Sequence, residues 1–210
     1  MLNKITFWNL ITLTLILLVS FFGVYFINYP MIIDIWEVIY ILEWEKMFFL
    51  FLGMVILSLI FALFPLKKMS YGNKFQKILL VLNVLILLYT FCYTISTFAK
   101  NKSELRKIEN EYIEQAKKDV KNDKVTFKFA GGLPVPEYDK NTYDKIDSIR
   151  KKYGIIYFNT GCIVDYKAIE AQKKYEIIVK PYLEKRNGKN WEAKMNDEIQ
   201  KVKSDYKKDR

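Results

Sequence analysis

The chain has 210 residues, a net charge of +10, two cysteines and no histidine. Because histidine is absent, Ser–His–Asp and Cys–His catalysis, HExxH zinc sites and all other histidine-based metal centres are excluded. The sequence also lacks the GxxxxGKS/T and GxGxxG phosphate-binding motifs. We therefore predict neither a metal centre nor a bound cofactor.

The charged residues divide the chain into two unlike parts. Residues 1–99 contain six Lys or Arg and four Asp or Glu, whereas residues 100–210 contain 27 and 19. We therefore predict an α-helical integral membrane domain with three transmembrane helices over 1–99. A helical stalk (100–122), a small soluble α/β domain (123–204) and a polar tail (205–210) are expected to follow.

Three charge-free runs support the membrane prediction, and they cover residues 6–28, 47–65 and 78–99. At about 1.5 Å rise per residue, a helix of the third run extends about 33 Å, close to the hydrocarbon thickness of a bilayer. In lipid, a lone apolar segment satisfies its backbone hydrogen bonds only as a helix. The first run is longer than the apolar region of a signal peptide and has no A-x-A-type cleavage site, so we expect it to remain as a span.

An acidic connector, Asp34–Lys46, joins the first two runs. Its apolar residues recur at helical spacing, and Trp36 and Trp44 suit the head-group level of a membrane. It is interpreted either as an interfacial helix or as an extension of the second span into water.

The short loop between the second and third runs sets the predicted topology. It carries four lysines and no acidic residue, and the positive-inside rule places such a loop in the cytoplasm. The N-terminus is then cytoplasmic and the C-terminal domain extracytoplasmic. Basic residues at 100–107, on the other side of the third run, argue for the opposite orientation. The lysines of the loop are Lys67, Lys68, Lys74 and Lys77.

The three runs contain no Asp, Glu, Lys or Arg. Ionisable groups inside a membrane mark ion paths and proton relays, so their absence argues against a pump or a proton-coupled carrier. Asn83 is the most polar residue near the middle of the third run. We interpret it as a side chain that hydrogen-bonds to another helix, with a pore or partner contact as the alternative.

The spacing of apolar residues predicts the helices and strands of the soluble part. Residues 103–122 have a four-spaced stripe typical of a helix, with the first residue as N-cap. Val125–Phe129 alternates as a half-buried strand does. Asn141–Tyr153 is predicted to be a helix capped by its first residue, and 154–158 a second strand. A strand–helix–strand crossover of this kind places two strands side by side, parallel or neighbouring.

A helical hairpin is expected to close this domain. Residues 165–186 carry one apolar seam, and Pro181 should bend that helix. Asn190 is predicted to cap a last helix, and from Lys203 onward we expect the chain to fray. An irregular loop precedes the first helix of the domain, and it contains Gly131, Gly132, Pro134 and Pro136.

The segment Asn159–Cys162 lies between a predicted strand and a predicted helix, and it is a candidate reactive site. A helix N-terminus lowers the pKa of a thiol, so Cys162 is a candidate nucleophile or redox group, with Asp165 as an accompanying carboxylate. The chain offers no histidine base and no CxxC partner. We therefore favour the interpretation of Cys162 as a small buried side chain in a tight turn.

The corner between the last two predicted helices combines cations with an aromatic ring. Arg186, Lys189 and Trp191 are candidate binding residues for an acidic or aromatic partner. The alternative is that Trp191 covers the inner face of the helical hairpin, and we favour it.

These observations predict an integral protein of a bacterial cell membrane that acts as a binding or structural module. Its C-terminal domain is expected to meet a protein or envelope partner, and its spans to contact the lipid bilayer and further copies of the chain. The alternatives are a membrane-bound enzyme or redox protein that uses Cys162, and an immunity protein against a toxin. The aromatic residues are not spaced for base stacking, which argues against nucleic acid as a partner.

Overall fold

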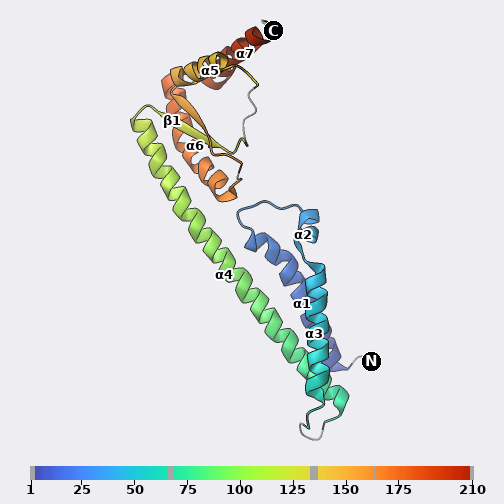
Figure 1. Ribbon diagram of the computed structural model, residues 1–210. Helices are drawn as coiled ribbons and strands as arrows, with labels where there is room; N and C mark the ends of the chain where they lie inside the picture. Colours follow the sequence, from blue (N-terminus) through green and yellow to red (C-terminus); the bar gives the residue numbers. More distant parts are fainter. Residues whose placement is uncertain (1–2, 66–68, 133–136, 163, 209–210) are drawn as a thin grey trace. The chain divides into compact units, whose positions relative to one another are not determined.

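The chain separates into two compact units, Met1–Ser103 (unit 1) and Glu104–Arg210 (unit 2). It is mostly helical, with three long apolar helices and, in the described residues, a two-stranded sheet. This confirms the coarse fold prediction. The predictions for Lys67, Lys68, Pro134 and Pro136 lie outside the described residues. The computed structural model (Figure 1) describes residues 3–65, 69–132, 137–162 and 164–208.

Unit 1 is built from apolar helices. α1, α3 and α4 are the helices in the described part of the chain that are long and apolar enough to cross a membrane, with mean hydropathies of 2.5, 2.0 and 2.4 over their most apolar stretches. The bounds of α1 and α3 lie within three residues of the predicted runs. The helices of this unit are α1 (Lys4–Ile27), α2 (Ile35–Ile41), α3 (Trp44–Ala62) and the first part of α4 (Tyr71–Lys121).

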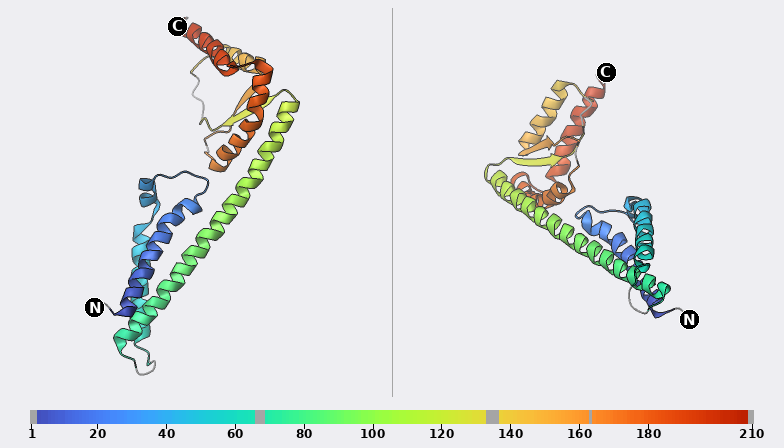
Figure 2. Two further views of the ribbon diagram at one scale, coloured as in Figure 1. Left: turned by 180° about the vertical axis from the view of Figure 1, so that it is seen from behind. Right: turned by 60° about the horizontal axis from the view of Figure 1, so that its bottom comes forward.

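Helix α4 continues without interruption through the predicted third span and the predicted stalk, as both views in Figure 2 show. Ser103 lies inside this helix, so its prediction as an N-cap is wrong. Residues 100–121 contain no Gly or Pro and are rich in Lys and Glu. Because these residues favour helix, the hydrogen-bond ladder of the apolar part propagates through them.

The connector Asp34–Lys46 is divided between two helices. Its first part forms α2, which begins after Asp34 and in which Val38 is fully buried. Its last residues belong to α3, which begins at Trp44. The connector is therefore not a plain extension of α3, because α2 is a separate helix that ends at Ile41. The interfacial position of α2 stays a prediction.

Asn83 hydrogen-bonds to another helix, which confirms the favoured interpretation of this residue. Its Nδ2 donates to Oδ1 of Asn9 in α1 at 3.1 Å, and both side chains are buried. The contact joins residues 74 positions apart in the sequence. It therefore fixes the register of α1 against α4 within unit 1.

Unit 2 contains the predicted strand–helix–strand arrangement. The two strands pair in parallel, with Val125 opposite Ile155 and Phe129 opposite Asn159. α5 lies between them in the sequence, and α6 and α7 follow. The elements are β1 (Val125–Phe129), α5 (Lys140–Lys152), β2 (Ile155–Asn159), α6 (Tyr166–Asn187) and α7 (Trp191–Lys208).

Two local predictions in unit 2 are wrong. The N-cap of α5 is Asp139, whose carboxylate accepts a hydrogen bond from the Thr142 N–H at 2.8 Å, so Asn141 lies inside the helix. The chain also stays helical beyond Lys203, as far as Lys208. The end of α7 is held because the Tyr206 ring packs edge-on against Tyr138, with ring centres 5.4 Å apart.

The core of unit 2 forms where both strands meet the helices. Val125, Ile155 and Leu183 are completely buried, and Tyr175 and Trp191 are nearly so. These residues come from β1, β2, α6 and α7, so one cluster joins all of these elements. The burial of this apolar cluster supplies the main driving force for the folding of the unit.

Candidate functional site

The structure places Cys162 on the surface. Its side chain is exposed, so the interpretation of Cys162 as a buried turn residue is wrong. Asp165 is the N-cap of α6, and its Oδ1 accepts hydrogen bonds from the N–H groups of Lys167 and Ala168 at 2.9 and 3.4 Å. The carboxylate is thus engaged in capping the first turn of α6. Among the described residues, no group of three or more Cys, Asp or Glu side chains is placed to hold a metal ion.

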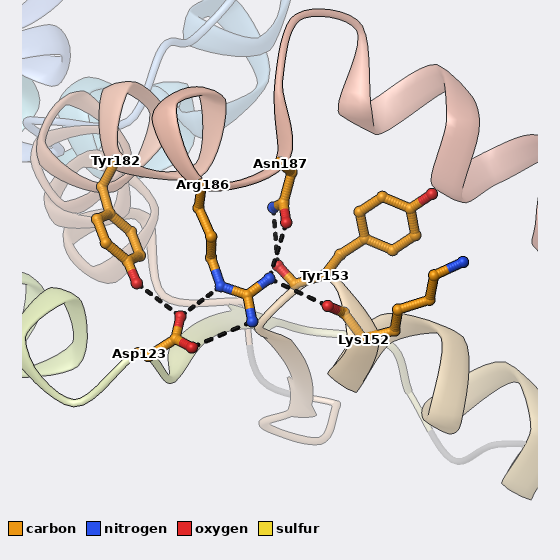
Figure 3. Close-up of polar contacts among 6 residues, drawn as sticks. All are labelled: Asp123, Lys152, Tyr153, Tyr182, Arg186 and Asn187. Atoms are coloured by element: carbon orange, nitrogen blue, oxygen red, sulfur yellow. Dashed lines mark hydrogen bonds and ion pairs between the residues drawn. The ribbon is translucent and has the colours of Figure 1, made fainter.

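Arg186 is held within unit 2 by a set of polar contacts (Figure 3). Its guanidinium forms a two-pronged contact with Asp123, through Nε to Oδ1 and through Nη2 to Oδ2, the latter at 3.1 Å. Nη1 donates to the carbonyl oxygen of Lys152 at 3.0 Å and to Oδ1 of Asn187 at 2.7 Å. The Tyr182 hydroxyl also donates to Asp123, at 2.6 Å.

These contacts connect the turn after α4, the end of α5 and the end of α6. Gly154 permits the arrangement, because it has φ +75° and a Cβ there would lie 3.0 Å from the Arg186 guanidinium. Trp191 is 4% exposed and belongs to the core, whereas Lys189 is exposed. The structure therefore does not bring Arg186, Lys189 and Trp191 together as a free recognition surface.

A polar cavity of about 380 Å³ lies within unit 2, between α4, β1 and α6. Its volume falls in the range of about 300–1,000 Å³ that is usual for small-molecule sites. It is the candidate functional site. Its walls are formed by Glu111, Tyr112 and Gln115 of α4, Thr126 and Lys128 of β1, and Gln172 and Tyr175 of α6.

Hydrogen bonds between α4, β1 and α6 hold one wall of this cavity in place. The Tyr175 hydroxyl donates to Oδ2 of Asp119 at 2.6 Å and accepts from the Thr126 N–H at 2.8 Å. The other oxygen of Asp119 accepts from Nε2 of Gln115 at 2.6 Å. Burial, and then the hydrogen bond to Asp119, raise the pKa of Tyr175 far above its ordinary value. The hydroxyl therefore keeps its proton and its donor role.

Gln172 differs from its neighbours in this cavity. Both its amide atoms, Nε2 and Oε1, are buried, and neither has a hydrogen-bond partner among the described residues. Buried polar groups without partners are rare and each costs about 1–3 kcal/mol. Gln172 lines the cavity, so a ligand that reaches the amide meets a donor atom, Nε2, and an acceptor atom, Oε1.

Charged side chains of both signs border the cavity. Lys128 Nζ lies over the Tyr112 ring, 5.0 Å from its centre, and both Lys128 and Glu111 are exposed. Burial, followed by the negative charges of Asp165 and Glu111, raises the pKa of Tyr112. The rim can therefore contact a positive or a negative group of a ligand, while the interior offers neutral hydrogen-bonding groups.

The sequence contains only an indirect signal for this site. Tyr112 and Tyr175 belong to the apolar stripes of residues 103–122 and 165–186. These stripes predict that the two helices pack, but not that their packing leaves a polar cavity. Gln172 follows Ala171, which lies on the apolar seam of residues 165–186. A glutamine beside a buried seam is the one indication of this site in the sequence, and apolar spacing alone does not distinguish it from a surface residue.

Comparison with protein-family models, with characterised proteins and with solved structures finds no match for this chain. The functional proposal therefore depends on the residues and contacts described above.

The contact between Arg186 and Asp123 predicts a pH-dependent stability. The Arg186 guanidinium, and then the Tyr182 hydroxyl, hold the pKa of Asp123 below its ordinary value of 3.8. The unfolded chain therefore takes up this proton first as the pH falls. The stabilisation is complete above about pH 4 and is lost as the pH falls through the lowered pKa. Because both groups reach the surface, solvent limits the contribution to about 1 kcal/mol.

We expect Arg186→Gln to lower the free energy of unfolding at pH 7 by about that amount, and the difference from the unmodified chain to shrink between pH 4 and pH 2. Urea unfolding of the full chain in detergent micelles measures both quantities. Lys185→Gln, which changes an exposed neighbour in the same helix, is the control. A difference of equal size at pH 7 and pH 2 would contradict the assignment.

Proposed function

We propose that the protein is a three-span integral membrane protein of a bacterial cell that presents unit 2 as a binding module. The spans are α1, α3 and the apolar part of α4. The exposure of large apolar side chains on these helices supports the proposal: Phe22 is 54% exposed, Phe49 67% and Leu85 57%. Apolar surface of this extent is unfavourable in water and is accommodated by lipid.

The proposed orientation places the N-terminus in the cytoplasm and unit 2 outside it. The lysine-rich stretch between the second and third apolar runs supports this orientation, because such stretches are retained on the cytoplasmic side. The structure places two of its predicted loop lysines, Lys74 and Lys77, in the first turns of α4, so the loop prediction is wrong for these two. In this arrangement unit 2 meets partners at the cell envelope.

The proposed ligand of unit 2 is a peptide group of an envelope or protein partner. The observation that carries this proposal is the Gln172 amide, whose buried donor and acceptor lack partners in the described residues. A peptide group offers one acceptor and one donor, so a single group can satisfy both atoms of the amide. The Lys128 ammonium and the Glu111 carboxylate at the rim suit the charged ends or side chains of a peptide.

The enzyme hypothesis has less support than the binding hypothesis. Cys162 does not line the cavity that holds Gln172, and the Asp165 carboxylate is engaged in capping α6. The toxin-immunity hypothesis stays a prediction.

The orientation predicts the reactivity of Cys162 in intact cells. Because its side chain is exposed, a membrane-impermeant maleimide should label the chain without lysis. Cys162→Ser should abolish the labelling, because the remaining Cys92 lies in the proposed third span. Labelling of the unmodified chain that appears only after the cells are opened would contradict the proposed orientation.

The peptide-binding proposal predicts opposite effects for two glutamines of the same cavity. Gln172→Leu removes two buried polar atoms that lack partners, so it should leave the free energy of unfolding unchanged or raise it by about 1 kcal/mol. Gln115→Leu removes the donor to Asp119 and should lower it by about 1 kcal/mol. Urea unfolding of the full chain in micelles measures both changes.

The binding itself is measured with acetyl-dialanine amide as the probe, by calorimetric titration of the full chain. We expect the unmodified chain and the control Gln200→Leu, at an exposed position of α7, to bind it equally. Gln172→Leu should weaken the binding at least tenfold. Equal binding by Gln172→Leu and by the unmodified chain would refute the proposed role of the amide.

A further inference from the structure

Unit 1 contains a second cavity, of about 400 Å³, between α1, α3 and α4. Apolar side chains such as Leu13, Met54 and Leu79 form most of its walls. None of the described residues that line it is charged. Its strongly polar groups are three amides, Asn9 in α1 and Gln76 and Asn83 in α4. The cavity thus combines mostly apolar walls with a few neutral polar groups.

The hydrogen bonds of these amides determine which of their polar atoms are left to bind an occupant. Nδ2 of Asn9 donates to the carbonyl oxygens of Gln76 and Ile5, at 3.0 and 3.3 Å. Oδ1 of Asn9 must therefore face a donor, and it accepts from Nδ2 of Asn83 at 3.1 Å. This order leaves Oδ1 of Asn83, which is buried without a hydrogen-bond partner among the described residues.

Asn83 is 2% exposed, so neither water nor lipid outside the protein contacts this unpaired acceptor. Asn83 lines the cavity, so an occupant that reaches this oxygen must donate a hydrogen bond to it. A carboxylate has no proton to donate, and no described cation lines the cavity to compensate its charge. The acceptor therefore selects a neutral group such as a hydroxyl.

The size and the depth of the cavity indicate the rest of the occupant. A water molecule takes up about 30 Å³, so a single water leaves most of the cavity unfilled. Asn83 follows Lys77 by six residues, which places it about 9 Å along the helix from that charge. In a membrane this is the level at which the polar part of a lipid gives way to its chain.

We propose that this cavity binds a hydroxyl-bearing lipid. The hydroxyl donates to Oδ1 of Asn83, and the acyl chain packs against the apolar walls formed by the three helices. The inference rests on the proposed embedding of unit 1 in a membrane. It is independent of the peptide site proposed in unit 2.

Photolabelling of the full chain in phosphatidylcholine vesicles tests this site. The probe is a monoacylglycerol that carries a diazirine on its acyl chain, and the labelled residues are identified by mass spectrometry. We expect labels on residues that line the cavity. An excess of unlabelled monoacylglycerol should suppress them, whereas the methyl ester of the same fatty acid, which has no hydroxyl, should not. This competition uses the unmodified chain and does not depend on the folding of a variant.

Two variants complete the test. Asn83→Leu removes the acceptor and should reduce labelling about tenfold. Thr90→Val is the matched control, because Oγ1 of Thr90 donates only to carbonyl oxygens of its own helix and the residue does not line the cavity. Its labelling should equal that of the unmodified chain.

Three results would overturn the inference: equal competition by the methyl ester, equal labelling of Asn83→Leu, or labels spread evenly over the outer faces of the helices. Flotation of the vesicles separates this failure from a failure of the membrane proposal. A chain that floats with the vesicles but lacks specific labels refutes the lipid site alone. A chain that does not float refutes the embedding, and the lipid site with it.

Discussion

A peptide group in hydrocarbon has no water to bond to, so its N–H and C=O must find partners within the protein. The three charge-free runs of this chain form helices, as their proposed placement in a membrane requires. Polar side chains in the same helices follow the rule as well. Ser58 and Thr90 donate back to carbonyl oxygens one turn earlier, as Thr12 does. Oδ1 of Asn83 departs from this pattern, and it lines a cavity.

Unit 2 obeys a different constraint, because a two-stranded sheet has little stability of its own. Its parallel strands are held by a shared apolar core and by the contacts of Arg186 with the turn after α4 and the end of α5. Here too, the described polar groups are mostly paired. The buried Nε of Arg150 belongs to a guanidinium that stacks on Tyr157, whereas Gln172 has no such compensation. The two proposed sites therefore lie where a buried amide is left without a partner.

The parts of the fold that depend on local pattern could be predicted from the sequence. Charge-free runs indicated α1 and α3, and strict alternation indicated β1 with its observed bounds. The wrong N-cap predictions arose where neighbouring residues favour a different start of the helix. Ser103 is a good N-cap residue but lies in a stretch that already favours helix, and Asp139 precedes Asn141 as a cap for α5. The cavities could not be predicted, because they depend on which faces of α1, α3, α4 and α6 meet. The orientation in a membrane stays a prediction.

The proposal that α1, α3 and α4 are embedded in lipid is tested most directly by alkaline carbonate washing of isolated membranes, followed by ultracentrifugation. Carbonate releases proteins held at the surface by charge but leaves membrane-spanning chains in the pellet. We predict that the full-length chain stays in the pellet and is released only by detergent. Recovery of the chain in the carbonate supernatant would contradict the account.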